Sequence, residues 1–488
     1  MAMVLTGLDP ILAALQTQLD DALQQSGTVP LNSTTLGSAG AGVIAQFSES
    51  LGVSAIVAGA SSTGVQPTVT ANPTANSVTV TGTATAPLLN ITNPSVVAVF
   101  TVTGQSLEVV LTIGTGTGWT LAQSFPLLGA SVFGQLSFDA STPPTFVLRT
   151  QDGPADTFGP VQTAGLNLAG SVTLTSTSPA SELLTLLPSV ANPLPMAGPV
   201  SIASDTETLS LRGAGPSFSL SIPRFVPLPF SQAAPVISGT STVDKAKKQV
   251  NILTVQVWGM VGAGAATLPL SVQVPISLEA WGVSLVPGKV ISFGALANVF
   301  SNLPILDVVP DAIKNISALE IDALALRLTP DRTAFTSLYV TVASTTRTSL
   351  SWTIVPDVLK LTGLSVTLAV VDDGQGNLTT TGLVEGDFEL GSSLSISIQL
   401  ALPIGSGPWS LTAYPDVALP NLGTLAKVIG GADLASMLPG KLGQIGGFTL
   451  ATLELTFDPS TLTFASVGIG LNSTTPWPVI PGSDQLVI

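Results

Sequence analysis

The chain contains no histidine and no cysteine, and it is poor in charged and aromatic side chains. Of its 488 residues, 9% are charged and 5% are aromatic, whereas roughly 25% are charged in an average soluble domain. Without these residues there is no Ser–His–Asp or Cys–His catalytic arrangement, no disulfide and no thiolate or imidazole metal site. The sequence therefore excludes most of the side chains on which hydrolytic, redox and zinc chemistry depends.

Basic residues are also scarce, since 14 Lys and Arg stand against 29 acids and give a net charge of −15. No base precedes Arg149, and residues 50–107 carry no charge. Because phosphates and anionic lipid headgroups bind to clustered bases, we expect neither nucleic-acid binding nor membrane contact through basic residues. The first residues contain no base and are followed by Asp20 and Asp21, so we expect no secretory signal peptide.

Hydrophobic residues make up 45% of the chain, and the mean hydropathy is +0.56. A transmembrane helix needs about 18–20 consecutive apolar residues. The best uncharged stretch, 258–278, is broken by Pro269 and Pro275, so we expect strands there and no membrane-spanning helix. This length and aliphatic content indicate a folded chain of two to four domains.

The first 28 residues are expected to form an N-terminal amphipathic helix. Its apolar positions follow the 3.6-residue helical period: Leu8, Ile11, Leu12, Leu15, Leu19 and Leu23. Asp9 is a suitable N-cap with Pro10 in the first turn, and Gly27 follows the helix. We expect this helix to pack on the first sheet; a membrane-active or oligomerising helix is the alternative.

Most of the remaining chain alternates aliphatic residues with Ser and Thr, as in the segments 77–85, 393–402 and 448–457. Such period-two alternation is typical of half-buried β-strands. We therefore predict a mainly β fold of antiparallel sheets, with a few short helices. The second strand face carries Ser, Thr and Ala where a water-facing strand would carry Lys and Glu.

An internal repeat accompanies these strands. Five tryptophans are its proposed anchors: Trp119, Trp281, Trp352, Trp409 and Trp477. Trp281 precedes Pro330 by 49 residues, and Trp409 precedes Pro459 by 50. We predict three related β-rich units in which the tryptophans anchor each core; contact with sugar or lipid is the alternative.

The predicted domain order follows from these units and from the prolines. A first β-rich unit over 29–190 follows the N-terminal helix of residues 1–28. A Pro-rich boundary at 191–240 separates it from repeat units at 241–365 and 366–488, because dense prolines suit a boundary or edge strands.

The pattern of a Trp-led segment, a Leu-Pro pair and a strand ending in FDP or LTPD resembles large uncharacterised repeat proteins of bacteria and fungi. The resemblance covers residues 95–485. It implies a modular, repeated architecture, and it supplies no activity and no catalytic residues.

Carboxylates are the only remaining candidates for site chemistry, because glycosidases and Ca²⁺ sites need only oxygen ligands. Glu385, Asp387 and Glu389 share one strand face in this pattern. They are the candidate metal site or acid/base pair, and a solvated strand that deters edge pairing is the alternative. The Asp372–Asn377 segment is expected to be a hairpin turn. No catalytic residue, cofactor-binding residue or cofactor is predicted.

The sequence thus favours a non-enzymatic, β-rich modular protein that handles apolar surface. It would do so by binding a lipid-like ligand or membrane, or by assembling with copies of itself. The alternatives are a structural filament subunit, a glycan-binding adhesin and a carboxylate-based polysaccharide hydrolase or lyase.

Overall fold

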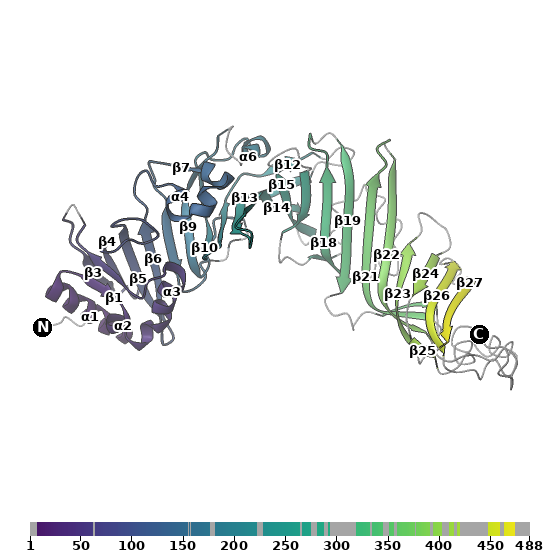
Figure 1. Cartoon of the computed structure of the whole chain (residues 1–488), viewed down its shortest axis with the longest axis horizontal. Coiled ribbons are helices and arrows are strands. Elements are labelled where there is room, and N and C mark those ends of the chain that lie inside the picture. Colours follow the sequence, from purple (N-terminus) through teal and green to yellow (C-terminus); the bar gives the residue numbers. More distant parts are fainter. Residues whose placement is uncertain are drawn as a thin grey trace. The chain divides into compact units, whose positions relative to one another are not determined.

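The structure is a computed structural model in which the chain is mainly β, as predicted. It describes residues 7–61, 64–154, 156, 158–175, 181–221, 228–263, 266–274, 281–286, 291–292, 319–331, 334–344, 351–355, 359–375, 377–390, 394–402, 409–413, 417–419, 448–458 and 463–473. The strands in these ranges belong to one antiparallel sheet (Figure 1). Two compact units are distinguished, and each is described by itself. Unit 1 contains residues 1–220, 229–260 and 271–279, and unit 2 contains the rest.

Unit 1 begins with four helical segments: α1 (Pro10–Ser26), α2 (Ser33–Leu36), the 3₁₀ helix η1 (Ser38–Gly40) and α3 (Ala41–Leu51). The Asp9 side chain caps α1 by accepting the N–H of Ile11 at 2.8 Å. Gly27 ends the helix in the left-handed conformation, with φ of 67°, which costs glycine little. Leu12, Leu15 and Leu19 lie on one side of α1 and are buried.

The strands of unit 1 follow one another across the sheet. They are β1 (Val29–Leu31), β2 (Ile56–Gly59), β3 (Thr68–Asn72), β4 (Ser77–Ala84), β5 (Ser95–Thr103), β6 (Ser106–Gly114), β7 (Ser137–Phe138), β8 (Thr145–Arg149), β9 (Gly165–Thr173), β10 (Leu194–Ile202), β11 (Thr206–Gly213), β12 (Phe218–Leu220) and β13 (Leu228–Val243). The pairing runs β4–β5–β6–β8–β9–β10–β11–β13, and every pair is antiparallel. β2 and β3 both pair with β4, and β1 pairs with β2. Sequence neighbours are thus spatial neighbours along most of this sheet.

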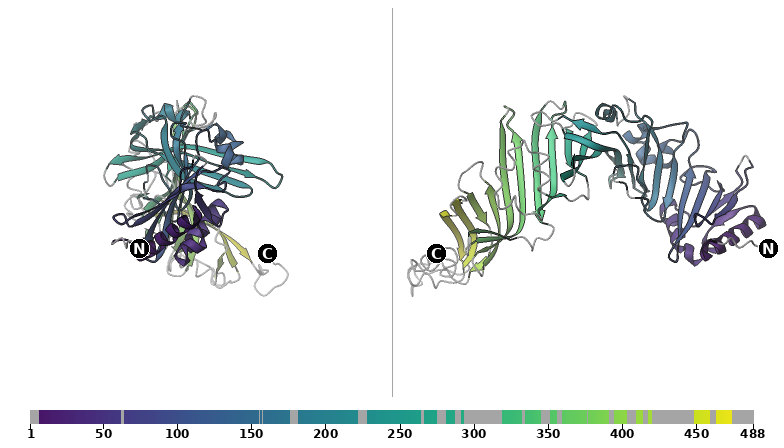
Figure 2. Two further views of the ribbon diagram at one scale, coloured as in Figure 1. Left: turned by 90° about the vertical axis from the view of Figure 1, so that its left-hand side faces the viewer. Right: turned by 180° about the vertical axis from the view of Figure 1, so that it is seen from behind.

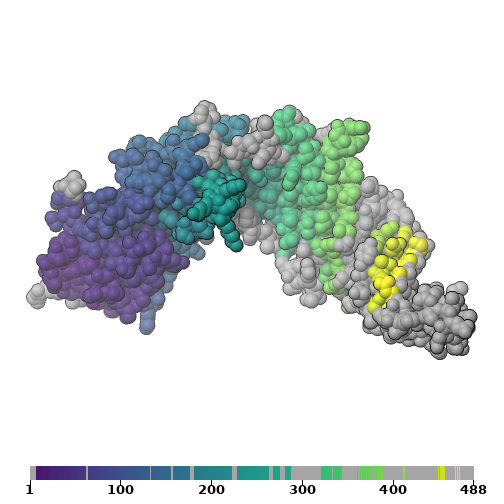
Figure 3. All heavy atoms as spheres, viewed as in Figure 1, coloured from purple at the N-terminus to yellow at the C-terminus, as the bar shows by residue number. Residues whose placement is uncertain are grey.

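Helices pack against one face of this sheet (Figures 1 and 2). Further helical segments lie between β6 and β10: α4 (Leu121–Ser124), α5 (Pro126–Gly129), η2 (Val132–Gln135) and α6 (Glu182–Leu186). α1 contacts β3, β4 and β5, α3 contacts β6 and β9, and α5 contacts β11. In Figure 3 the purple surface at the N-terminal end includes α1, α2 and α3.

Alternate strand residues fill the core beneath these helices. In β5 and β6 these are Val96, Ala98, Phe100, Leu107, Val109, Leu111 and Ile113, each at most 5% exposed. Buried phenylalanines from helices and strands complete this core: Phe47, Phe100, Phe125, Phe133 and Phe146. The aliphatic residues of the alternating segments therefore form a core face, because alternate residues of a strand, and the residues opposite them on paired strands, lie on one side of a sheet.

The Pro-rich segment 191–240 forms β10, β11, β12 and most of β13. β10 pairs with β9 on one side and with β11 on the other. The change from unit 1 to unit 2 occurs between residues 220 and 280, where β14 (Gln249–Ala263) and β15 (Ala266–Val274) lie.

Unit 2 is an antiparallel sheet of its own strands: β16 (Trp281–Leu285), β17 (Ile291–Ser292), β18 (Leu319–Leu328), β19 (Phe335–Ser344), β20 (Ser351–Val355), β21 (Leu359–Asp372), β22 (Leu378–Leu390), β23 (Leu394–Leu402), β24 (Trp409–Ala413), β25 (Val417–Leu419), β26 (Phe448–Asp458) and β27 (Thr463–Ser473). The pairing runs β18–β19–β21–β22–β23–β24–β26–β27. β16 and β17 both pair with β18, and β20 pairs with β21.

Two hairpins of unit 2 have the same register. β18 pairs with β19 and β26 pairs with β27, and the residues in each hairpin correspond with an offset of 129. Both hairpins shift register at two corresponding points, namely Ile321/Ala323 and Arg327/Leu328 in the first and Leu450/Thr452 and Thr456/Phe457 in the second. The strands that begin with Trp281 and Trp409 pair with corresponding residues, Leu328 and Phe457.

None of the helices in the described ranges combines the length and the apolar character needed to cross a bilayer.

Candidate functional site

The three predicted carboxylates lie along β22 in unit 2. Glu389 faces Lys360 of β21 across the sheet, and its carboxylate lies 3.3 Å from the ammonium group. Asp387 is exposed and Glu385 is half-buried. Within the described part of the chain, no group of three or more acidic residues could hold a metal ion. The cation site therefore stays a prediction, and the observed contact of Glu389 is a cross-strand ion pair.

The segment predicted as a hairpin turn joins β21 to β22. Its carboxylates accept backbone N–H groups: Asp372 from Gly374 at 2.8 Å, and Asp373 from Gln375 at 2.7 Å and from Asn377 at 3.0 Å. Asp and Asn side chains commonly stabilise turns in this way. These oxygens hold the turn together.

Two of the five tryptophans have described side chains, and both are buried. Trp119 is 8% exposed, donates from Nε1 to Ser124 Oγ at 3.0 Å, and meets Phe138 and Phe146 edge-on. Trp281 is 2% exposed and donates from Nε1 to the Pro330 carbonyl at 3.1 Å. Neither ring is available for stacking on a sugar.

The side chains of the other three predicted tryptophans lie outside the described residues. Trp352 lies in β20 and Trp409 begins β24, whereas all of Trp477 lies outside those residues. Trp119 differs from Trp281 in that it lies in the loop after β6 and not in a strand.

The side of the unit 1 sheet opposite the helices is the most extensive candidate surface, and we call it the open face. Its residues from β4 to β13 are Thr79, Thr81, Val97, Val99, Val110, Thr112, Ala169, Ser171, Pro199, Ser201, Thr208, Ser210, Ser238 and Thr240. These residues carry no charge and most are half-buried. Three charged residues share the same strand faces near the strand ends: Glu108 of β6, Arg212 of β11, and Arg149 of β8, which is directly opposite Val110. An ordinary water-facing strand surface carries charged side chains, whereas this one is largely aliphatic and hydroxyl-bearing.

The aliphatic part of the open face lies on β4, β5 and β6. Val99 is opposite Val110 on one side and Thr79 on the other. Val97 is likewise flanked by Thr112 and Thr81. Directly opposed residues lie about 4.5–5.5 Å apart at Cβ, so the valines form one continuous patch with threonines beside them.

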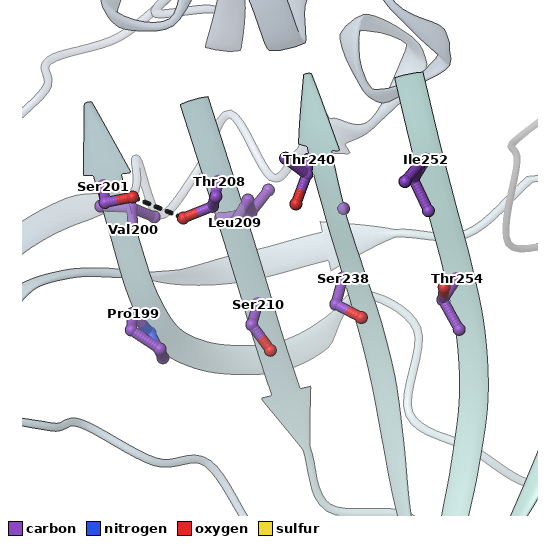
Figure 4. Close-up of a pocket in the computed structure, with 11 residues that line it drawn as sticks. Pro199, Val200, Ser201, Thr208, Leu209, Ser210, Ser238, Thr240, Ile252 and Thr254 are labelled. Carbon is purple, nitrogen blue, oxygen red and sulfur yellow. Dashed lines mark hydrogen bonds between the residues drawn. The ribbon is translucent and has the colours of Figure 1, made fainter. Parts of the chain in front are cut away.

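The hydroxyl-bearing part lies on β10, β11, β13 and β14, where the face contains a hollow of about 300 Å³. Figure 4 shows two rows of side chains across these strands, one from Ser201 to Ile252 and one from Pro199 to Thr254. Ser201 and Thr208 are joined by a hydrogen bond of 2.6 Å. Ile252, at the end of its row, is 61% exposed. This hollow presents hydroxyl groups beside apolar surface.

Charged groups at the margin of the open face bind the chain's own loop, residues 150–164. Arg212 donates from Nε to the Gly159 carbonyl at 2.7 Å, and its guanidinium lies 5.5 Å from the centre of the Trp258 ring. Burial lowers the pKa of Arg212 from its usual value, although an arginine stays protonated in proteins. Arg149 donates to Gln162, and Glu108 accepts from Gln151.

The open face was indicated by the sequence only as an unusual second strand face rich in Ser, Thr and Ala. Its hollow joins residues 199–254 of four strands, and a sequence pattern does not report which strands become neighbours. Among the described residues of the open face, no nucleophile lies beside a general base. Comparisons with protein-family models, with curated proteins and with solved structures found no match.

Proposed function

We propose that the protein is a non-enzymatic binding protein and that its open face holds an elongated, uncharged, largely apolar ligand such as a lipid. The observation that carries this proposal is the continuous run of aliphatic and hydroxyl side chains on the open face, where the few charged residues lie near the strand ends. Its half-buried Val and Thr side chains are continuous across hydrogen-bonded strands. Large apolar patches of this kind usually mark interaction sites.

Burial of apolar surface would supply most of the binding free energy. Each square ångström of apolar surface removed from water stabilises a complex by roughly 25 cal/mol before the costs of association. An extended chain lying across Val97, Val99 and Val110 would cover such surface beside Arg149, which is opposite Val110 and already bonded to Gln162. The hydroxyls near Ser201 and Thr208 supply hydrogen bonds for a polar end, such as an ester or hydroxyl.

The nature of the ligand follows from the charges. Arg149 and Arg212 are the bases on this face among the described residues, and both already bind loop 150–164. An anionic headgroup would therefore lack a partner on this face. A neutral ligand fits the surface best.

The test is native mass spectrometry of the full-length protein together with lipid extraction. We expect neutral lipid to co-purify with the wild type and to be reduced about tenfold in Val99→Lys, because a desolvated ammonium without a partner costs free energy. Thr103→Lys, at the exposed end of β5, is the matched control and should retain the lipid. Equal lipid content in both variants would contradict the proposal.

Self-association is the second candidate, and exposed apolar residues on β14 favour it. Val250 and Ile252 are 50% and 61% exposed. Large lipid-free assemblies in the same measurement would replace the ligand proposal with a structural one. A compact, lipid-free monomer that does not bind liposomes would contradict both the ligand proposal and the self-association proposal.

We also infer that β16–β19 and β24–β27 are copies of one repeated unit. The common offset of 129 residues and the two corresponding register shifts support this inference. β-Bulges are specific features that related strands share. The segment around Trp119 lacks this arrangement because its tryptophan precedes helices α4 and α5.

A further inference from the structure

A second hollow lies on the helix-covered side of unit 1, away from the open face. Its volume is about 650 Å³, within the range of small-molecule sites. Four segments line it: the end of α3 with the glycine that follows (49–52), the loop before β5 (87–90), the α4–α5 region (124–127) and the β10–β11 connection (202–207). We call it the acidic hollow.

Among the described residues that line it, the charged groups are the carboxylates of Glu49 and Glu207. Glu49 is exposed at the end of α3, whereas Glu207 on β11 is 3% exposed. Neither has an ion-pair partner among the described residues. No lysine or arginine precedes Arg149 in the sequence, so most of the chain that surrounds this hollow contains no cation.

Only one of the two carboxylate oxygens of Glu207 has a hydrogen-bond partner in the described chain. Its Oε2 accepts the N–H of Leu128, in the short helix α5, at 2.8 Å. Its Oε1 has no hydrogen-bond partner in the described chain. This oxygen is not fully enclosed by protein atoms, so it is open to the hollow that Glu207 lines. A buried carboxylate without a counter-charge costs free energy. A cation in the hollow would supply the missing partner.

The rest of the lining mixes apolar and polar residues. Its larger apolar residues are Leu51, Pro87, Leu89, Pro126, Leu127 and Ile202, and its polar residues are Ser50, Asn90, Ser124 and Ser204. Ile202 is 43% exposed. Leu89 has φ of 52°, a left-handed conformation that is uncommon for leucine. Its carbonyl accepts Ser124 Oγ at 2.6 Å, and Ser124 accepts Trp119 Nε1, so the wall is held in place from the core.

We propose that the acidic hollow binds an organic cation with an apolar body, such as an alkylammonium compound. The ammonium group pairs with Glu207 and Glu49, and the alkyl part covers Leu89, Leu127 and Ile202. A bare metal ion is a poorer fit, because no group of three acidic residues occurs among the described residues. The site is separate from the open face and does not depend on the function proposed for it.

The experiment is isothermal titration calorimetry of the full-length protein with n-octylammonium chloride below its micelle concentration. We expect binding at least about tenfold tighter than that of n-octanol or n-octyl sulfate, because only the ammonium satisfies the carboxylates. Glu207→Gln keeps a carbonyl oxygen for the Leu128 N–H and should weaken binding about tenfold. Glu49→Gln, at an exposed position, should weaken it severalfold without affecting folding.

Asp21→Asn on α1 removes the same charge outside the hollow and should leave octylammonium binding unchanged. Val99→Lys should reduce lipid retention but not octylammonium binding, which separates this proposal from the function of the open face. Equal affinity for octanol, or equal binding by Glu207→Gln and Glu49→Gln relative to wild type, would overturn the proposal. Binding of Ca²⁺ without binding of octylammonium would overturn it as well.

Discussion

At the scale of single residues, the described tryptophans act through their indole N–H groups as well as their rings. Trp281 bonds to the carbonyl of Pro330, and 49 residues separate the two, the spacing that marked the repeat. Trp119 bonds to Ser124, which in turn holds Leu89. A buried indole N–H needs a partner, so these bonds fix distant loops on the core.

Trp119→Phe should destabilise unit 1 by about 1–3 kcal/mol, because it removes buried ring area and the bond to Ser124. Ser124→Ala keeps the ring but leaves the indole N–H unpaired, and should cost a similar amount. Trp258→Phe is the control, since that half-buried indole N–H bonds to the neighbouring Gln256 and a phenyl ring can still lie beside Arg212. Urea unfolding followed by circular dichroism measures all three, and equal midpoints for Trp119→Phe and Trp258→Phe would contradict the argument.

At the scale of elements, local chemistry explains the ends of helices, whereas packing explains the close approach of strands. The cap residues Asp9 and Gly27 are adjacent to α1, and their effect is local. Gly239 of β13 is different: a Cβ there would lie 1.8 Å from the Phe133 ring of η2 and 2.7 Å from the carbonyl of Ile252. Its importance depends on the next strand, β14, and on η2, which is far away in the sequence.

Gly239→Ala should therefore destabilise the protein by about 1–3 kcal/mol, because the buried Phe133 ring must move. Gly42→Ala in α3 is the matched control. A Cβ there meets nothing within 4 Å, so that variant should be more stable by about 0.4–1 kcal/mol, through loss of freedom in the unfolded chain. The two urea midpoints should move in opposite directions, and a shift of both in one direction would contradict the expected clash between a Cβ at residue 239 and Phe133.

At the scale of the whole molecule, charge and surface composition act together. The net charge of −15 keeps copies apart at neutral pH, while the open face offers them largely uncharged surface. With no histidine, the charge changes little between pH 6 and 8 and falls as carboxylates are protonated toward the isoelectric point of about 4.2.

We expect the hydrodynamic size to rise as the pH falls from 6 to 4.2, because association is favoured when the net charge approaches zero. Val99→Lys should suppress this rise more than Thr103→Lys, although both variants add one positive charge. Dynamic light scattering across this range checks it. Identical curves for the two variants would place the associating surface elsewhere.

The sequence by itself determined the mainly β class, because alternation with period two is a local property of each strand. It also determined what is excluded, since missing histidine and cysteine need no fold to interpret. The acidic hollow could not be foreseen: Glu49 and Glu207 are 158 residues apart in the sequence and line one hollow only in the folded chain.

Tertiary structure alone also decided which of the two strand faces is covered. The alternation marks two faces but does not say where the helices lie, and contacts of α1, α3 and α5 with the sheet determine which residues are core. The carboxylates of β22 show the same limit, because Lys360 becomes the partner of Glu389 only through the register of β21 with β22. Local pattern governs burial along a strand, and long-range pairing governs which surfaces and charges meet.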